Sequence, residues 1–257
     1  MSELTGWQRA GVIAAQVLTV CLLGFAWQAA ANAHAINTFF FSSPRIVWHQ
    51  LDQWASGGEL FPNVGATLYV LAIGYLLGLA LGIVLGVVSG VMRTVGAVID
   101  PFVAFFNAIP RLVLLPLLIV WFGFGYWPQI FFVVAVVVFL VAINVSAGLR
   151  QVKTILLANA RVLGANGPQL VRYVYLPSIV VWIMSTARVT VGFAFQAAVA
   201  AEFIGAARGL GFLVEYGQST FQVQQIYAAL AIMIVIAVVV DLGLGAVERS
   251  TTKWLPK

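Results

Sequence analysis

The sequence predicts an all-α integral membrane protein with six transmembrane helices and with both termini in the cytoplasm. Three observations lead to this fold class. Hydrophobic residues make up 62% of the 257 residues and charged residues only 8%, whereas a soluble domain carries about 25% charged residues. The apolar residues form six runs of about 20 residues or more, long enough to cross a bilayer. Lys and Arg gather in alternate connections between those runs, which sets the orientation.

The segment between the first and second apolar runs differs in composition from its neighbours. Residues 34–62 are more polar and contain Pro44, Gly57, Gly58 and Pro62, so we expect an external segment with a short amphipathic helix near 44–55. We expect the first run to be retained as a span, because it is longer than the core of about 7–15 residues typical of a cleaved signal peptide. The six predicted spans are 11–32, 64–91, 101–123, 127–149, 177–204 and 226–247.

The basic residues decide which connections are cytoplasmic. With both termini inside, only Arg45 and Arg208 lie in outer loops, and the reverse topology would place most of the basic loops outside. The inner segments then hold Arg9, Arg93, Arg150, Lys153, Arg161, Arg172, Arg249, Lys253 and Lys257.

Glycines recur every four residues in the second predicted span. Small residues at this spacing let helix backbones approach closely, which substitutes for the hydrophobic effect that lipid removes. A step of four residues turns about 400°, so the glycines drift slowly around the helix and can face more than one neighbour. We favour tight packing within one subunit over a subunit interface. The series is Gly74, Gly78, Gly82, Gly86 and Gly90.

The connection between the fourth and fifth spans is polar and basic and contains no acidic residue. Residues 156–163 can form a short helix that ends at Gly164, because glycine tolerates a positive φ. Gly167-Pro168 predicts a further turn, and 169–175 a second short helix. Such a bent helix suits a cleft in a cytoplasmic partner protein, and its charge also suits an anionic lipid surface. The expected shape and charge of this connection leave both interpretations open, docking to a protein and binding to a lipid surface.

The sequence of this connection resembles a known family. Ala158-Asn159-Ala160-Arg161-Val162-Leu163-Gly164-Ala165, followed by Val174-Tyr175-Leu176-Pro177, is similar to the "EAA" loop of binding-protein-dependent ABC importer permeases. Ala160, Gly164 and the Leu-Pro ending match the motif. Ala158 stands where the family has glutamate and Asn159 where it has the first alanine, so one ion-pair anchor to an ATPase is missing.

Other segments resemble the nitrate/sulfonate/taurine branch of that family, in the same order along the chain. They are Ser43–Trp48, Asn107–Leu117, Trp121–Gly125, Ala201–Gly205 and Gly209–Gly211. The resemblance implies one transmembrane permease domain over 1–257, with a permease core at 63–249 and an N-terminal span plus external segment at 1–62.

The resemblance also implies partners and a location. These are a second copy of the chain, two cytoplasmic ATP-binding subunits that carry ATP and Mg, and an external binding protein, all at a bacterial inner membrane. No cofactor, metal or nucleic acid is expected on this chain. The chain has no Gly-x-x-x-x-Gly-Lys-[Ser/Thr] phosphate loop, so we expect no ATPase activity of its own. The implied solute is a small anion such as a sulfonate, taurine or nitrate.

Two sets of site residues follow. The expected ATPase-docking set is Ala160, Arg161, Leu163, Gly164, Ala165 and Pro177, and the expected translocation-pathway set is Asn107, Arg111, Gln196 and Glu202. Arg111 lies between Pro110 and Pro116, which break the helix locally, and broken helices are tolerated where they line a cavity. The alternative is that Arg111 snorkels to the membrane interface.

Other polar residues in the spans have structural interpretations. Glu202 either serves transport or holds the loop around Gly209–Gly211 by accepting backbone N–H bonds. Asn144 is expected to bond a neighbouring helix, and Asp241 to pair with a basic residue or to cap backbone groups. Arg188 and Glu202 are fourteen residues apart on one helix, so they cannot pair with each other.

Two other function classes remain open at this point. An ion-gradient-driven secondary transporter would show inverted repeats and intramembrane carboxylates, and the sequence shows no convincing repeat. A membrane enzyme would need a catalytic cluster. His34 and His49 lie in the external segment with Asp52 nearby, which is typical of a solvated helix face.

Overall fold

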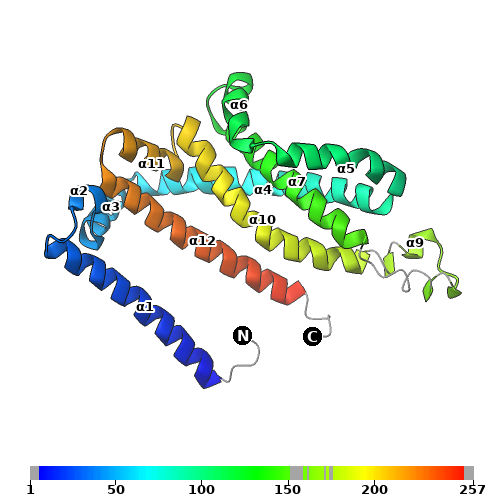
Figure 1. Cartoon of the computed structure of the whole chain (residues 1–257), viewed down its shortest axis with the longest axis horizontal. Helices are drawn as coiled ribbons and strands as arrows, with labels where there is room; N and C mark the ends of the chain where they lie inside the picture. Colours follow the sequence, from blue (N-terminus) through cyan, green and yellow to red (C-terminus); the bar gives the residue numbers. More distant parts are fainter. Residues whose placement is uncertain (1–5, 151–158, 161, 171, 174–175, 252–257) are drawn as a thin grey trace. The chain divides into compact units, whose positions relative to one another are not determined.

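The computed structural model describes residues 6–150, 159–160, 162–170, 172–173 and 176–251 (Figure 1). Within these ranges every regular element is a helix, so the predicted all-α class is confirmed. Five of the described helices are long and apolar enough to cross a membrane, or six if one sharply bent pair forms a single span. The cytoplasmic location of the termini stays a prediction.

The helices that qualify as single spans cover five of the six predicted runs. They are α1 (Gly6–Asn32), α4 (Leu60–Val91), α7 (Tyr126–Arg150), α10 (Leu176–Gly205) and α12 (Val223–Thr251). The shorter elements are α2 (Thr38–Phe41), α3 (Pro44–Ser56), α5 (Arg93–Ala108), the 3-10 turn η1 (Arg111–Leu114), α6 (Leu115–Phe122), α9 (Gly167–Leu170) and α11 (Leu210–Ser219).

The chain divides into two compact units. One comprises Met1–Phe61 and Leu213–Ala231, and the other comprises Pro62–Phe212 and Ile232–Lys257. Residues 213–231 therefore group with the N-terminal part, although the sequence assigned them to the permease core. The division into a core at 63–249 and an N-terminal part at 1–62 stays a prediction.

In the first unit, α3 is the amphipathic helix that the sequence predicted. Ser43 caps it by accepting a hydrogen bond from the N–H of Ile46, and Pro44 occupies the first turn, where its missing N–H costs nothing. The helix is tied to α1, because the side-chain oxygen of Gln28 accepts the N–H of Arg45 at 3.0 Å. Its buried residues, spaced for one helix face, are Val47, Gln50 and Trp54.

The core of the second unit forms around α7, along which α10 packs (Figure 1). The glycines of α4 meet α7 at regular intervals. A Cβ on Gly74 would lie 2.7 Å from the Cβ of Val133, and a Cβ on Gly90 would lie 2.8 Å from that of Leu149. The three glycines between them face Val137, Val141 and Val145 in the same way. The glycine series thus seats α4 on a single neighbour within one chain, as the favoured interpretation expected.

The third predicted span is broken. The α5 helix ends at Ala108, and the following pair of η1 and α6 is bent away by 86°. Ile109 has ψ 133°, since the residue before a proline is pushed out of the helical region. The predicted local break at the prolines is confirmed, and the span predicted over 101–123 consists of two helical pieces. The first piece begins earlier, at Arg93, and contains Pro101 in its interior.

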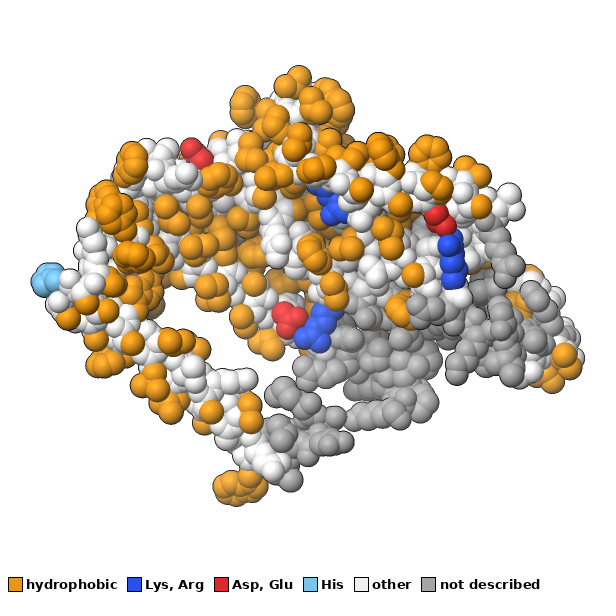
Figure 2. Space-filling model, viewed as in Figure 1, with side chains coloured by type: hydrophobic (Ala, Val, Ile, Leu, Met, Phe, Trp, Pro, Cys, Tyr) orange, Lys and Arg blue, Asp and Glu red, His pale blue; other side chains and the backbone are white. Residues whose placement is uncertain are grey.

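The surface of the described residues is that of a membrane protein. Figure 2 shows hydrophobic side chains spread over the described part of the visible face, with only a few charged side chains among them. Many large apolar side chains are exposed along the spans, for example Leu76, Val84 and Val239. Asn144 donates to the carbonyl of Leu140 on its own helix at 2.8 Å, so the expected bond to a neighbouring helix is wrong.

Candidate functional site

A shallow cavity of about 380 Å³, wide open to the surroundings, lies where the broken third span meets α7 and α10. Three of the four predicted pathway residues line it, although they are far apart in the sequence. Asn107 comes from the end of α5, Arg111 from η1, and Gln196 from α10. Its other lining residues are apolar: Ile109, Phe132, Val136, Phe193, Ala197 and Ala200.

The break in the span places Arg111 at this cavity. Because α5 stops at Ala108, the next turn brings residue 111 back towards the last turn of α5. Its Nη2 donates to the side-chain oxygen of Asn107 and, at 3.4 Å, to the Asn107 carbonyl. Its Nε is buried and has no hydrogen-bond partner among the described residues. The guanidinium is thus folded back onto Asn107 rather than extended along the helix.

The cavity has an asymmetric electrostatic character. Arg111 is the one ionisable side chain among its lining residues. Phe132, Val136 and Phe193 form an apolar wall beside it, and an apolar wall strengthens the field of a nearby charge relative to open water. Gln196 adds an amide that both donates and accepts. This arrangement can attract a small anion and offer it hydrogen bonds. The pathway role of the residues stays a prediction.

The fourth predicted pathway residue, Glu202, does not line this cavity. It is 1% exposed, and its Oε2 accepts the hydroxyl of Thr67 at 2.9 Å and the N–H of Gly211 at 2.9 Å. The carboxylate therefore holds the turn between α10 and α11 from inside, as one of the two sequence interpretations expected. Its Oε1 is buried without a hydrogen-bond partner among the described residues.

Two residues of α4 complete this buried network, and sequence analysis missed both. The side-chain oxygen of Asn63 accepts the N–H of Gly209 at 2.9 Å, and the hydroxyl oxygen of Thr67 accepts the N–H of Leu210 at 2.9 Å. Asn63 and Thr67 are four residues apart, so they share one helix face. Polar side chains at that spacing within an apolar run were the available signal. The network fastens the α10–α11 turn to the beginning of α4.

The charged residues near the other end of α10 form an ion pair. Arg188 Nε lies 3.0 Å from Asp241 Oδ1, and its Nη2 lies 3.1 Å from Oδ2. This confirms the expected basic partner for Asp241. The pair joins α10 to the part of α12 in the same unit, and both side chains are half-exposed.

The expected docking segment is described in part. Gly164 has φ +84°, the left-handed conformation that its helix-ending role predicted. The N–H of Ala165 donates to the carbonyl of Ala160 at 3.0 Å, the bond of a glycine-terminated helix. Leu163 next to this bend is 86% exposed. Arg161 and Ala158 lie outside the described residues, and Pro177 belongs to the first turn of α10.

Beyond the bend, the predicted turn and second helix differ from the observed ones. Asn166 and Gln169 exchange side-chain hydrogen bonds with each other's backbone N–H groups, at 2.9 and 3.1 Å. This reciprocal capping begins a helix, so α9 starts at Gly167 itself rather than after a turn. The role of these residues in docking stays a prediction.

Comparison with known proteins shows the family to which the chain belongs. Residues 78–253 match the family described as "Binding-protein-dependent transport system inner membrane component", which is more than half of the chain. The chain belongs to this family. It is a multi-pass membrane permease component of an ABC importer, and its predicted recognition as such is confirmed.

Individual relatives extend over almost the whole chain. The taurine transport system permease protein TauC of Escherichia coli is 28% identical and covers 96% of this chain and 92% of its own length. The putative aliphatic sulfonates permease SsuC of Bacillus subtilis is 27% identical over 97% and 88%. The riboflavin transport system permease RibX of Chloroflexus aurantiacus is 34% identical over 92% and 88%.

Solved structures agree on the fold. An inward-facing structure of the MetNI methionine ABC transporter has a TM-score of 0.64 at 23% identity, covering 74% of this chain and 95% of that chain. An amino acid ABC transporter has a TM-score of 0.63 at 18% identity, covering 80% and 98%. At these identities the likeness concerns the fold alone. None of the comparisons favours the ion-gradient-driven alternative.

Proposed function

We propose that this permease component forms the translocation pathway for a small anionic solute of the sulfonate, taurine or nitrate class, delivered by an external binding protein. The observation that carries the proposal is the cavity in which Asn107, Arg111 and Gln196 meet. Taurine and sulfonate permeases among its relatives support the same class.

The cavity chemistry favours an anion with an apolar part. A single guanidinium in an apolar wall stabilises one negative charge, and among the described residues no carboxylate lines the cavity to receive a cation. Phe132 and Phe193 offer apolar surface to a short hydrocarbon chain. An alkanesulfonate satisfies both features. Because taurine carries an additional ammonium group, it would leave that group without an ionic partner here.

Transport of this kind needs partners. We expect a second copy of the chain to complete the pathway and two ATP-binding subunits, with ATP and Mg bound to them, to drive it. The segment around Gly164 is the expected docking element, because its exposed Leu163 and glycine bend present an apolar projection. ATP binding closes the partner dimer and thereby favours one conformation of the spans over the other.

The test is uptake by the assembled importer. The chain would be purified with the ATPase and binding protein encoded beside it, reconstituted in vesicles, and supplied with ATP. Uptake would be measured separately for an alkanesulfonate, taurine, nitrate and riboflavin. We expect ATP-dependent uptake of the alkanesulfonate. Uptake of riboflavin alone would overturn the anion assignment, and a chain that purifies without any ATPase would overturn the importer assembly.

Variants of the cavity sharpen this test. Arg111→Ala should reduce anion uptake by about tenfold, since about 1.4 kcal/mol of lost stabilisation is a factor of ten, whereas Gln196→Ala should reduce it less. Arg111→Lys keeps the charge and serves as the matched control, with most uptake retained. Equal losses for Arg111→Ala and Gln196→Ala, or no loss for either, would remove the electrostatic argument.

A further inference from the structure

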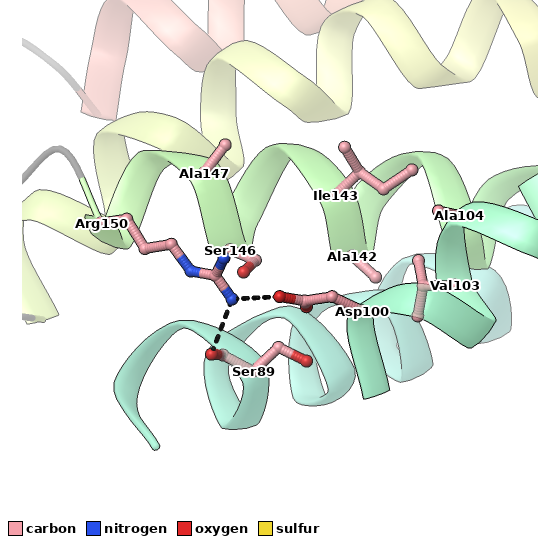
Figure 3. Close-up of a pocket in the computed structure, with 9 residues that line it drawn as sticks. All are labelled: Ser89, Asp100, Val103, Ala104, Ala142, Ile143, Ser146, Ala147 and Arg150. Atoms are coloured by element: carbon pink, nitrogen blue, oxygen red, sulfur yellow. Dashed lines mark hydrogen bonds and ion pairs between the residues drawn. The ribbon is translucent and has the colours of Figure 1, made fainter. Parts of the chain in front are cut away.

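A cluster of residues from three helices lies at the end of α7, which precedes the expected docking segment in the sequence. Arg150, the last residue of α7, places its Nη2 2.5 Å from Asp100 Oδ2 on α5 and donates to the carbonyl of Ser89 on α4 at 3.2 Å (Figure 3). We call Ser89, Asp100 and Arg150 the Arg150 cluster. The three helices lie close together here, since a Cβ on Gly96 would lie 2.9 Å from Arg150 Nη2.

Arg150 is the residue of α7 that lies nearest in the sequence to the expected docking segment. In the sequence, Arg150 precedes Ala160, the first residue of the expected docking set, by ten residues. A displacement that reaches α7 from that segment along the chain arrives at Arg150, the last residue of the helix. Arg150 then passes the displacement to α4 and α5, because it is bonded to both.

One face of α5 connects the cluster to the cavity. Asp100, Val103 and Ala104 line a hollow of about 350 Å³ against α7 (Figure 3), and Asn107 lines the cavity that contains Arg111. Positions 100, 103, 104 and 107 share one helix face. Asp100 and Asn107 are two turns, or about 10 Å, apart. At the far end Asn107 accepts the hydrogen bond from Arg111.

The α5 helix contains a proline directly after Asp100, the residue that binds Arg150. Pro101 lies inside α5, where it removes one backbone hydrogen bond and favours bending. Asp100 is the residue immediately before it. With Asp100 fixed to Arg150, the end of α7 and α5 move together. Without the ion pair, a displacement of the end of α7 is no longer passed to α5 at Asp100, so this route to Asn107 is lost.

From this continuity we propose that Arg150 and Asp100 are a positioning pair, which couples the nucleotide state of the partner ATPase to the conformation of the Arg111 cavity. The inference rests on the proposed importer function. It predicts that breaking the pair leaves ATPase docking and hydrolysis in place but disconnects them from the cavity. A mere loss of stability would instead lower docking and hydrolysis as well.

The experiment follows cavity access without needing the solute. A reporter cysteine, Ala200→Cys, would be placed in the cavity lining in a Cys21→Ser background, within the purified complex with its ATPase. Methyl methanethiosulfonate, a small neutral reagent, would label it in the nucleotide-free state and after trapping with ATP and vanadate. We expect about a tenfold difference in labelling rate between the two states when the pair is intact.

Variants of the two residues test whether the ion pair carries this coupling. Asp100→Asn and Arg150→Gln should reduce that difference to less than about twofold while the ATPase still co-purifies and hydrolyses ATP. The charge-swapped double variant Asp100→Arg with Arg150→Asp should restore at least half of the nucleotide-dependent difference in labelling rate. Asp241→Asn, which breaks another half-exposed ion pair of this unit, is the control and should leave the difference unchanged.

Several results would overturn the inference, each distinguishable from failure of the importer assignment. An unaltered difference in Asp100→Asn would show that the pair transmits nothing. Loss of the ATPase from Arg150→Gln would make Arg150 a docking residue instead. No nucleotide-dependent change in the unaltered complex would show that the cavity does not follow the ATPase. Absence of any co-purifying ATPase would instead refute the proposed function itself.

Discussion

Gly78→Ala should weaken the packing of α4 on α7. A Cβ at position 78 would lie 2.7 Å from the Cβ and 3.0 Å from the Cγ1 of Val137, whereas ordinary contacts lie near 3.4–4 Å. The nearest backbone atom, the Cα of Val134, would lie at 3.3 Å, so side chains alone cannot relieve the contact. The two helices must separate by roughly 0.5–1 Å, because van der Waals repulsion is steep.

The cost follows from the contacts that such a gap weakens. A gap of this size forfeits a quarter to a half of each heavy-atom contact worth about 0.1–0.2 kcal/mol, so roughly 30 contacts along the neighbouring turns lose about 1–3 kcal/mol. Overpacked cores show a similar penalty of about 1–3 kcal/mol. In a bilayer this packing term is decisive, since no hydrophobic effect drives helices together there.

The assay is unfolding in mixed micelles by increasing SDS, followed by tryptophan fluorescence. Gly65→Ala is the matched control, because it lies on the same helix and a Cβ there meets nothing within 4 Å. A double-mutant cycle of Gly78→Ala with Val137→Gly isolates the contact and should give a coupling energy of about 1–2 kcal/mol. Equal stability of Gly78→Ala and Gly65→Ala, or a coupling energy near zero, would refute the reasoning.

The remaining predictions concern the α10–α11 turn and the docking segment. Glu202→Ala should cost about 2–3 kcal/mol in the same SDS titration, because it leaves the buried donors of Thr67 and Gly211 without their acceptor; a loss no larger than that of Gly65→Ala would contradict this. Gly211→Ala should sharply lower the yield of folded protein, since its Cβ would overlap the carbonyl oxygen of Val199, and normal yield from membranes would exclude that contact. Gly164→Asp should abolish transport by weakening ATPase docking while membrane insertion persists; normal uptake by vesicles would refute the docking assignment.

The sequence by itself determined the class of protein and most of its helices. Low charge and long apolar runs exclude a soluble domain, and their lengths give the spans. Local chemistry fixed further details: the Ser43-Pro44 start of α3 and the left-handed Gly164. The resemblance carried by Gly164 and the Leu176-Pro177 ending gave the family. Such features depend on neighbouring residues alone, so they can be read along the chain.

Tertiary structure alone decided which distant residues meet. The sequence placed a break near Pro110, but only the 86° bend brings Arg111 back onto Asn107 and opposite Gln196. It also decided between the two interpretations of Glu202, because Asn63 and Thr67 come from a helix about 140 residues earlier. The Arg150 cluster is of the same kind, with partners 50 and 61 residues away. Long-range contacts depend on how helices pack and bend. The periodicity of a helix specifies only which of its faces is buried, and not which residues of other helices pack against that face.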